Sequence, residues 1–368
     1  MYKELILNDT NQLMENNEFS SDNPYDITSN DKISVMFYLL YSTIFSVGLF
    51  GNLLVCYAVF RNKSMQTVTN LFIVNLALSD ILLCFFAVPF TPLYLLTFKN
   101  WIFGHILCHL VPYVQSLSVY ISSFTLMSIA IHRFVVIMKP FKSRIKVYVC
   151  INIITVIWIF TIFLTLPFGY YMNMNEQYDE LNQTIYLCDE NWTKEDMRKT
   201  FVIISPILQF VLPFIITLYC YIKICKRLSQ RVRCMSGSKS AKREEADREK
   251  TRRTNRMLMV MVLVFGLSWL PLNCHNLIQD FNDSYSEWAF VQLFFLASHL
   301  IAMSSTCYNP FFYAWLNDNF RKEFKQVLPC FKQSQLRRHH SSKLSERNTL
   351  TGQTRESSFF THSKIVNH

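Results

Sequence analysis

The sequence predicts an all-α membrane protein, a seven-transmembrane helix bundle with a short amphipathic membrane-surface helix after the seventh helix. Of its 368 residues, 51% are hydrophobic and only 17% are charged, whereas soluble domains carry about a quarter charged residues. The uncharged residues are gathered in seven long runs, and most basic residues fall on one side of those runs. These features argue against an ordinary soluble enzyme and place the chain in a bilayer.

Each of the seven runs is long enough to cross a bilayer as a helix, since about 20 residues span the roughly 30 Å hydrocarbon core. The runs are Ile33–Phe60, Val68–Phe98, Trp101–Met138, Val147–Tyr171, Thr200–Ile222, Met257–Gln279 and Trp288–Leu316. Only the second and third contain a charged residue, Asp80 and Arg133 respectively. Membrane strands need only about 9–11 residues, so the lengths favour helices.

The segment after the seventh run predicts a short helix on the membrane surface. In Asn317–Leu328, the apolar residues Phe320, Phe324 and Leu328 recur every fourth position and share one helix face. Cys330 follows and is a candidate for palmitoylation, with an ordinary buried or surface thiol as the alternative. We therefore expect an extracellular glycosylated N-terminus (1–32), the bundle with its amphipathic helix (33–328) and a disordered cytoplasmic tail (329–368).

Charge asymmetry predicts the orientation of the seven helices. With the N-terminus outside, the outer segments hold six Lys and Arg residues against seventeen acids, a net charge of −11. The inner segments hold 29 Lys and Arg residues against eight acids. Basic residues are retained on the cytoplasmic side, so we expect a multi-pass plasma-membrane protein with an extracellular N-terminus. The overall charge of +10 then reflects topology and contact with anionic membrane lipids, not binding of nucleic acid.

Two covalent features follow from this orientation. Four Asn-X-Ser/Thr sequons lie on the outer side, so we expect N-glycosylation at Asn8, Asn182, Asn191 and Asn282. Of the eleven cysteines, only Cys108 and Cys188 lie on the oxidising outer side. A single disulfide is therefore predicted between the outer end of the third helix and the second outer loop.

A single acid, Asp80, lies in the membrane core, where polar groups are costly and mark functional sites. Five polar residues of neighbouring helices lie at depths that allow them to converge on it, namely Asn52, Asn75, Ser122, Ser305 and Asn309. A carboxylate with hydroxyl and amide oxygens suits a hard cation such as Na⁺ or a water cluster. A protonated Asp80 satisfied by asparagine partners is the alternative. No other metal or cofactor is expected.

Motifs across residues 33–330 together resemble those of rhodopsin-like (class A) G-protein-coupled receptors. They are Gly51-Asn52, Leu76-Ala77-Leu78-Ser79-Asp80, His132-Arg133-Phe134, Trp158, Phe265 with Trp269-Leu270-Pro271, and Asn309-Pro310-Phe311-Phe312-Tyr313. The resemblance implies that a ligand moves the sixth helix outward and opens an inner crevice for a heterotrimeric G protein. It also implies a relay between the two ends, made by Phe265, Trp269, Pro271, Asn309, Pro310, Tyr313 and Tyr221.

The chain departs from the family pattern beside Arg133, the implied contact for the G protein. His132 replaces the usual acid, and Phe134 replaces the usual tyrosine. In relatives that acid pairs with the arginine and restrains the resting state. We therefore expect weaker restraint of Arg133 and some ligand-independent signalling.

The tail contains eleven Ser and Thr residues between Ser334 and Ser363. Phosphorylation by receptor kinases would allow a basic patch on arrestin to bind the added phosphates. An unmodified, solvated tail is the alternative.

The resemblance also narrows the class of ligand. Amine receptors of the family have an Asp where this chain has Gln115, and opsins have a Lys in the seventh helix, which Trp288–Leu316 lacks. Six polar residues instead resemble the ligand site of neuropeptide Y receptors, namely Thr91, Gln115, Gln209, Asn276, Asp280 and His299. The stretch His299–Ser304 is most similar to invertebrate neuropeptide F and FMRFamide-like peptide receptors. Their ligands end in Arg-Phe-amide or Arg-Tyr-amide, and tachykinin-like or prolactin-releasing-peptide-like ligands are the alternatives.

Charge and residue chemistry favour the same ligand without the resemblance. A net charge of −11 on the outer side steers cationic peptides. Asp280 directly follows the sixth run, where its carboxylate is placed to bind a guanidinium through two bonds, and Gln115 and Asn276 suit a C-terminal amide. The alternative is that the acidic outer face only keeps a glycoprotein soluble.

Other classes of protein are disfavoured by what the sequence lacks. A transporter typically has internal repeats, and a channel needs rings of polar residues along its pore. An enzyme needs a catalytic constellation. We see none of these patterns, and a membrane transporter remains the most reasonable class outside receptors.

Overall fold

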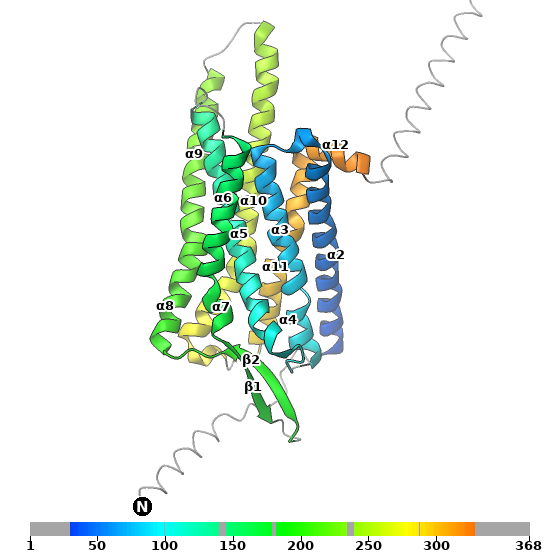
Figure 1. Ribbon diagram of the computed structural model, residues 1–368, viewed down its shortest axis with the longest axis vertical. Coiled ribbons are helices and arrows are strands. Elements are labelled where there is room, and N and C mark those ends of the chain that lie inside the picture. The colour runs from blue at the N-terminus through cyan, green and yellow to red at the C-terminus, as the bar shows by residue number, and fades with distance from the viewer. Residues whose placement is uncertain are drawn as a thin grey trace, which may run out of the picture. The chain divides into compact units, whose positions relative to one another are not determined.

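The computed structural model describes residues 30–98, 100–139, 145–178, 182–233, 239–286 and 288–327 (Figure 1). The chain divides into two compact units, residues 1–312 and residues 313–368, and each is treated by itself. Asn8 and Cys330, the predicted glycosylation and palmitoylation positions nearest the two termini, lie outside the described residues.

Within the described residues, seven helical spans are long and apolar enough to cross a membrane, as the sequence predicts. Four of them are single helices, α2 (Asp31–Arg61), α5 (Gly104–Met138), α6 (Val147–Leu164) and α11 (Val291–Leu316). The second span joins α3 (Val68–Phe86), α4 (Phe90–Pro92) and η3 (Leu93–Phe98). The fifth joins α8 (Glu195–Pro206), η4 (Ile207–Val211) and α9 (Leu212–Arg233), and the sixth belongs to α10 (Lys239–Phe281). The chain is therefore a multi-pass membrane protein.

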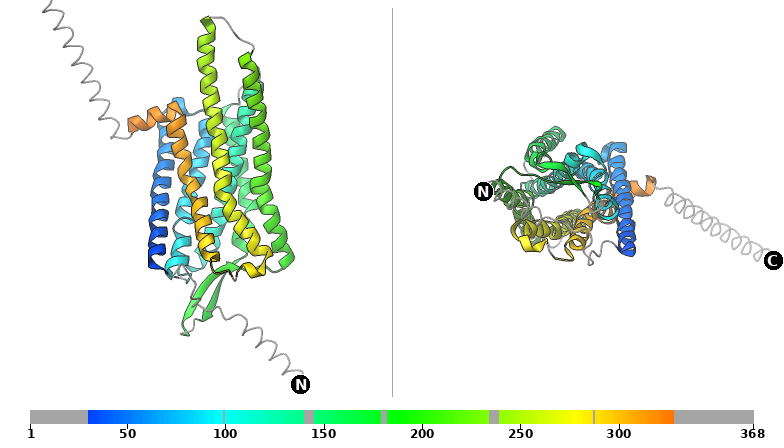
Figure 2. Two further views of the ribbon diagram at one scale, coloured as in Figure 1. Left: turned by 180° about the vertical axis from the view of Figure 1, so that it is seen from behind. Right: turned by 90° about the horizontal axis from the view of Figure 1, so that it is seen from below.

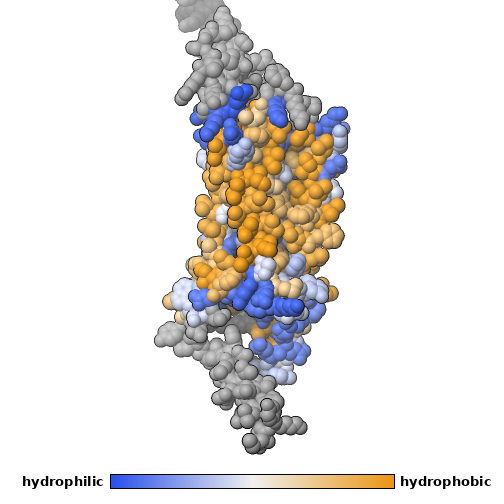
Figure 3. Space-filling view, turned by 90° about the vertical axis from the view of Figure 1, so that its left-hand side faces the viewer, coloured by the Kyte–Doolittle hydropathy of each residue, from blue (hydrophilic) through white to orange (hydrophobic). Residues whose placement is uncertain are grey.

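Hydrophobic side chains cover the helices between their ends, and hydrophilic residues gather at both ends (Figure 3). Leu39 of α2, Phe163 of α6 and Leu267 of α10 are 65%, 67% and 66% exposed. Such exposure is unfavourable in water, but the hydrocarbon core of a bilayer provides an apolar surrounding for these side chains. The exterior therefore fits a lipid environment.

Buried polar side chains connect the helices, and one of them, Asn75, differs from the sequence prediction. The side-chain nitrogen of Asn52 donates to the backbone oxygens of Gly48 and of Thr306 in α11, each at 2.9 Å. Asn75 of α3 donates to the Thr125 hydroxyl of α5 at 2.7 Å. Oδ1 of Asn75 accepts from Nε1 of Trp158 at 2.8 Å, so the predicted convergence of Asn75 on Asp80 is wrong. Oδ1 of Asn52 has no hydrogen-bond partner among the described residues, and its approach to Asp80 stays a prediction. The depth of a residue along a helix does not fix the direction in which its side chain points.

The helices α2 and α11 approach each other closely at a glycine. A Cβ atom on Gly51 would lie 2.8 Å from Cγ of Pro310, closer than non-bonded carbon atoms normally approach. Seen from behind, α11 lies between α2 and α10 (Figure 2). The missing side chain at Gly51 thus allows α11 the close contact with α2 on which the hydrogen bond from Asn52 depends.

The segment between the fourth and fifth spans forms a β-hairpin, which the sequence analysis did not predict. β1 (Met172–Tyr178) and β2 (Thr184–Glu190) pair antiparallel, with Met174 opposite Cys188. The available signal was the alternation of Met and Asn over residues 172–175, a period of two that is typical of a strand.

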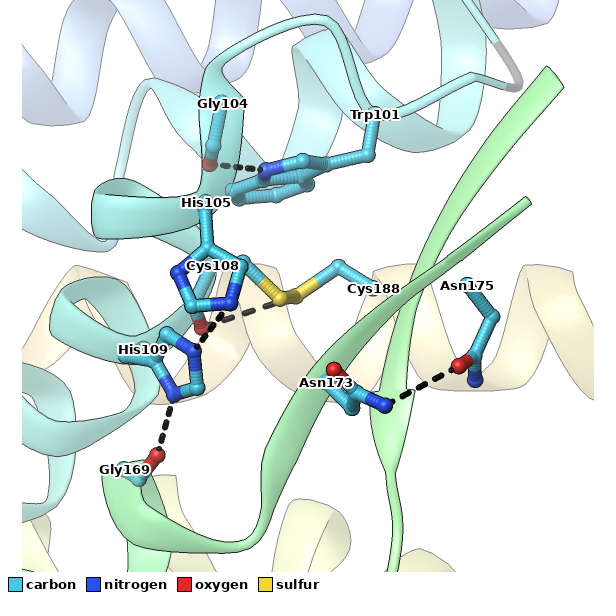
Figure 4. The surroundings of a disulfide bond; sticks show 9 residues. All are labelled: Trp101, Gly104, His105, Cys108, His109, Gly169, Asn173, Asn175 and Cys188. Atoms are coloured by element: carbon cyan, nitrogen blue, oxygen red, sulfur yellow. Dashed lines mark hydrogen bonds between the residues drawn. A yellow bond between two sulfur atoms is a disulfide. The ribbon is translucent and has the colours of Figure 1, made fainter.

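The hairpin is attached to the start of α5. Cys188 forms the predicted disulfide with Cys108, with the Cα atoms 5.7 Å apart (Figure 4), so this prediction is confirmed. The backbone nitrogen of Trp101 donates to the carbonyl of Tyr186 at 2.7 Å. The Tyr186 nitrogen in turn donates to Oδ1 of Asn100, also at 2.7 Å. One covalent bond and two hydrogen bonds therefore fix β2 to the same short segment.

Among the described residues, the first unit also contains three short helices, η2 (Lys63–Met65), α7 (Leu166–Tyr170) and η5 (Asp283–Tyr285). The second unit contains α12 (Asp318–Val327), which begins one residue later than the predicted helix. Phe320 and Phe324 of α12 are buried, and Phe320 stacks on Tyr313 with ring centroids 5.3 Å apart. The predicted apolar face is thus present for these two residues, while Leu328 lies outside the described residues.

Candidate functional site

The predicted functional residues divide between the two ends of the helices in the first unit. We call the end with β1, β2 and α8 the hairpin end, and the opposite end the Arg133 end (Figures 1 and 2). All six predicted ligand-binding residues lie in the half of their span nearer the hairpin end. They are Thr91 in α4, Gln115 in α5, Gln209 in η4, Asn276 and Asp280 in α10, and His299 in α11.

These six residues differ in how accessible they are. Asn276 is exposed, and Thr91, Gln115 and Asp280 are partly exposed, whereas Gln209 and His299 are only 7% and 1% exposed. Nδ1 of His299 lies 2.8 Å from the Tyr41 hydroxyl, and its Nε2 has no hydrogen-bond partner among the described residues. Four of the six side chains are therefore accessible to solvent, and Gln209 and His299 are not.

The carboxylate of Asp280 is paired with an arginine of the same chain. Nη1 of Arg198, in α8, contacts Oδ1 of Asp280. Nη2 of the same guanidinium lies 2.7 Å from Oε1 of Glu195. The sequence predicted that Asp280 binds a guanidinium but gave no sign that Arg198 would supply one, because the two residues are 82 positions apart.

Glu190, the last residue of β2, adds a further acid to this group. Trp192 donates from Nε1 to Oε2 of Glu190 at 2.7 Å. Burial raises the pKa of the Glu190 carboxyl, and the negative charge of Asp280 raises it further. The hydrogen bond from Trp192 and the positive charge of Arg198 act in the opposite direction and lower this pKa. Arg198 is therefore surrounded by three acids, Glu190, Glu195 and Asp280, which together form a cation-binding group at the hairpin end.

An aromatic cluster lies deeper along α10. Trp269 and Phe265 have ring centroids 6.3 Å apart, and Phe210 of η4 lies 6.4 Å and 6.0 Å from them respectively. Trp269 donates from Nε1 to the Ser305 hydroxyl of α11 at 3.2 Å. Phe210 was missed by the sequence analysis, since a phenylalanine in a span rich in phenylalanine carries no distinguishing signal.

Hydrogen bonds divide the residues predicted to surround Asp80. Asn309 donates to Oδ2 of Asp80 at 2.8 Å, as expected for a direct neighbour. Ser122 instead bonds to Ser79 at 2.7 Å, and Ser305 accepts from Trp269. Asp80 is 3% exposed, so its buried carboxylate has the donor chemistry for a hard cation, with Asn309 as its nearest amide.

The groups at the Arg133 end have few partners. Nε of Arg133, Nδ1 of His132 and the Tyr221 hydroxyl are buried without a hydrogen-bond partner among the described residues. The guanidinium of Arg133 interacts electrostatically with the phenol of Tyr221. No described acid forms an ion pair with Arg133, which agrees with the replacement of the usual acid by His132. Tyr313 belongs to the second unit and is not placed relative to this group.

Three of the predicted glycosylation sites are described and exposed. Asn182 precedes β2, Asn191 follows it, and Asn282 follows α10. All three adjoin elements of the hairpin end, so an attached glycan would meet no helix packing.

Comparison with known proteins gives the class of this chain. The model of the seven-transmembrane receptor family of rhodopsin type matches residues 51–313. This range includes Asp80, Arg133, Trp269 and Asn309, and it covers most of the chain. The protein therefore belongs to the rhodopsin family of seven-transmembrane receptors, and it is a receptor and not an enzyme.

The most similar relatives narrow the comparison to peptide receptors. The chain is 37% identical to neuropeptide Y receptor type 6 of Mus musculus over 298 residues, 79% of each chain. It is 34% identical to the neuropeptide F receptor of Drosophila melanogaster over 299 residues, 78% of this chain and 61% of the relative. It is 33% identical to the RYamide receptor of Tribolium castaneum over 337 residues, 86% of this chain and 89% of the relative.

The replacement at His132 leads to a prediction about signalling without ligand. His132→Asp would place a negative charge beside Arg133 and stabilise the resting state by about 1 kcal/mol, the upper end for a partly exposed pair. We expect ligand-free signalling to fall by about fivefold, measured as second messenger in cells at matched surface expression. His132→Asn, which adds no charge, serves as the control. Unchanged or higher basal signalling in His132→Asp would contradict the expected restraint.

Proposed function

We propose that this chain is a G-protein-coupled receptor for an amidated neuropeptide that ends in Arg-Phe-amide or Arg-Tyr-amide. The observation that carries the proposal is the Asp280 carboxylate, which lies at the hairpin end and binds the guanidinium of Arg198. A carboxylate that accepts a guanidinium of its own chain has suitable chemistry to accept one from a peptide. The names of the relatives support this ligand class, since they include receptors for neuropeptide F, neuropeptide Y and RYamide.

In the proposed complex, the penultimate arginine of the peptide replaces Arg198 at Asp280. Arg198 is able to leave because it keeps a second carboxylate partner, Glu195, at 2.7 Å. The acids around it retain a negative field that favours the incoming cation. The exchange therefore substitutes one guanidinium for another and leaves no buried charge without a partner, which would be costly.

The terminal amide of the peptide is assigned to the polar residues beyond Asp280. Gln115 and Asn276 are accessible, and their side-chain amides both donate and accept hydrogen bonds. Thr91 adds a hydroxyl at the same end. Gln209 and His299 are buried, so we assign them to the second layer, which orients the residues that touch the peptide.

Signal transmission is assigned to α10 and its neighbours. The peptide's aromatic terminus would press on the cluster of Trp269, Phe265 and Phe210, whose Trp269 is bonded to Ser305. Pro271 lies inside α10 and frees a carbonyl, so the helix is able to bend there. The relay continues through Asn309 and Pro310 of α11, with Tyr313 beyond them.

At the Arg133 end, Arg133 and Tyr221 are assigned to contact with a heterotrimeric G protein. Arg133 carries a buried nitrogen without a hydrogen-bond partner among the described residues, and such a group gains stability when a partner arrives. His132 is assigned to the same contact. Receptor kinases and arrestin are assigned to the tail, and membrane lipids to α12 and to a palmitoyl chain on Cys330.

The hairpin end is proposed to face the outside of the cell, with an extracellular N-terminus and the chain in the plasma membrane. The disulfide Cys108–Cys188 lies at this end, and disulfides persist in oxidising compartments. The exposed sequons at Asn182, Asn191 and Asn282 adjoin the same end, and N-glycans are attached outside the cytoplasm.

A sodium ion is proposed as an allosteric ligand of the Asp80 carboxylate. Ser122, Ser305 and Asn309 are the expected contributors of further oxygen ligands. Carboxylate, hydroxyl and amide oxygens are the ligands that hard cations prefer, and a buried carboxylate gains most from a counter-ion.

The ligand assignment predicts a dependence on both the amide and Asp280. In cells expressing the chain, an Arg-Phe-amide peptide should activate the G protein, and its free-acid form should be much weaker because a new negative charge enters an acidic site. Asp280→Ala should lower the potency of the amide by about 30-fold or more, since the bound peptide buries the pair and removing one partner of a buried, hydrogen-bonded charge pair costs about 2–5 kcal/mol. Asp196→Ala removes an exposed acid of α8 and should have little effect. Silence of the surface-expressed wild type to every such amide would contradict the ligand class.

The ion pair predicts the opposite effect for Arg198. Arg198→Ala frees Asp280 and should raise the potency of the same amide by about 1.4–5-fold, because a partly exposed ion pair contributes about 0.2–1 kcal/mol. Lys199→Ala is the matched control, since Lys199 lies beside Arg198 and contacts Glu195 at 3.8 Å. A loss of potency in Arg198→Ala as large as in Asp280→Ala would show that Arg198 binds the peptide itself, and would refute the exchange.

A further inference from the structure

Two imidazoles meet on the first turns of α5, at the hairpin end. His105 and His109 are four positions apart, so they project from the same face of the helix. Their Nε2 atoms lie 3.2 Å apart, with ring centroids at 4.4 Å (Figure 4). Both residues lie beside Cys108, which holds the disulfide to β2. Neither histidine has a part in the proposed recognition of the peptide.

The orientation of the His109 ring is fixed from its other side. Nδ1 of His109 lies 2.8 Å from the carbonyl oxygen of Gly169 in α7 (Figure 4). A carbonyl oxygen only accepts hydrogen bonds, so Nδ1 carries the proton and Nε2 of a neutral His109 presents a lone pair toward His105. Metal-binding histidines have this same arrangement, in which the second ring nitrogen donates to a carbonyl or carboxylate.

The close packing of α7 on α5 makes this contact possible. A Cβ atom on Gly169 would lie 2.9 Å from the His109 carbonyl oxygen and 2.9 Å from Cβ of Tyr113. A side chain at Gly169 would therefore force α7 away from α5. The carbonyl oxygen of Gly169 would then no longer reach Nδ1 of His109. The absence of a side chain at Gly169 thus allows its carbonyl to fix the orientation of the His109 ring.

The separation of the two nitrogens suits a transition-metal ion. Zn²⁺ binds imidazole nitrogens at about 2.0–2.1 Å in tetrahedral geometry, which places two such nitrogens about 3.3 Å apart. The observed distance is 3.2 Å. His105 is exposed, so water has access to the remaining coordination positions. No third His, Cys, Asp or Glu joins the pair among the described residues.

We propose that His105 and His109 form a binding site for a transition-metal cation of the Zn²⁺ or Cu²⁺ class. Nε2 of each imidazole ligates the ion, and water completes its coordination. Ca²⁺ and Mg²⁺ prefer oxygen ligands and are excluded. Because His109 is bonded to α7 and its neighbour Cys108 is bonded to β2, the bound ion stabilises the junction of α5, α7 and the hairpin. Two protein ligands make the site reversible, as expected for a modulatory ion and not a structural one.

The test is a thermal unfolding titration with ZnCl₂ on the purified full-length receptor, carrying an affinity tag without histidine. The midpoint temperature of the wild type should rise with Zn²⁺ concentration, because an ion that binds the folded state stabilises it by mass action. MgCl₂ should produce no shift, and CuCl₂ should produce one. The chain contains nine histidines, each with an imidazole that offers a ligand to Zn²⁺. The result is therefore decided by single-site variants and not by the wild-type shift alone.

His105→Ala is the decisive variant, because its exposed ring is expendable for folding. It should need at least about 10-fold more Zn²⁺ for the same shift, a factor that loss of even an outer hydrogen-bond partner produces. His105→Asp, which keeps a ligand atom, should recover part of the affinity, and His109→Ala should lose it. His275→Gln, which removes a histidine of α10, should respond as the wild type does. An equal response in the wild type and His105→Ala, or no response in the wild type, would overturn the proposal.

Discussion

One turn of α11 binds three other helices through hydrogen bonds that the bilayer offers no water to replace. Ser305 accepts from Trp269 of α10, the Thr306 carbonyl accepts from Asn52 of α2, and Asn309 donates to Asp80 of α3. In a hydrocarbon layer each broken bond leaves a polar group unsatisfied at a cost of several kcal/mol. These helices therefore move together or exchange hydrogen-bond partners. A displacement of Trp269 would move or break its hydrogen bond to Ser305 of α11. The proposed relay from the hairpin end to the Arg133 end rests on this coupling.

The two ends of the first unit are built on contrasting electrostatics. At the hairpin end, Arg198 is held between Glu195 and Asp280, so a cation site is already formed and occupied by the chain itself. At the Arg133 end, Arg133 has no described acidic partner and retains an unsatisfied nitrogen. In the proposed function, an incoming cation replaces an existing partner at the first end, whereas an incoming protein supplies a missing one at the second. The disulfide and the Gly169–His109 contact join the hairpin and α7 to α5 at the first of these ends.

The fold followed from the sequence more completely than the site did. The lengths of the seven apolar runs are constrained by the thickness of the bilayer, and the pairing of Cys108 with Cys188 followed from topology alone, so both predictions were confirmed. The ion pair of Arg198 with Asp280 was not predictable, because a contact between residues far apart in sequence depends on how the helices are rotated. The same limit explains Asn75, whose depth was right but whose side chain turned to Thr125. The hairpin was missed because a short alternation in a polar loop is a weak signal beside long apolar runs.

The central claim is that Asp280 binds the arginine of the peptide, and a double-mutant cycle tests it most directly. Binding is measured for wild type and Asp280→Ala, each with an Arg-Phe-amide peptide and with the same peptide carrying citrulline, which is uncharged, in place of arginine. If Asp280 and the peptide arginine contact each other, replacing the arginine by citrulline has little further effect on binding to Asp280→Ala. The coupling energy between the two changes should then be about 1.5 kcal/mol or more. Independent, additive losses would contradict the account, because they would mean that Asp280 and the peptide arginine act at separate places.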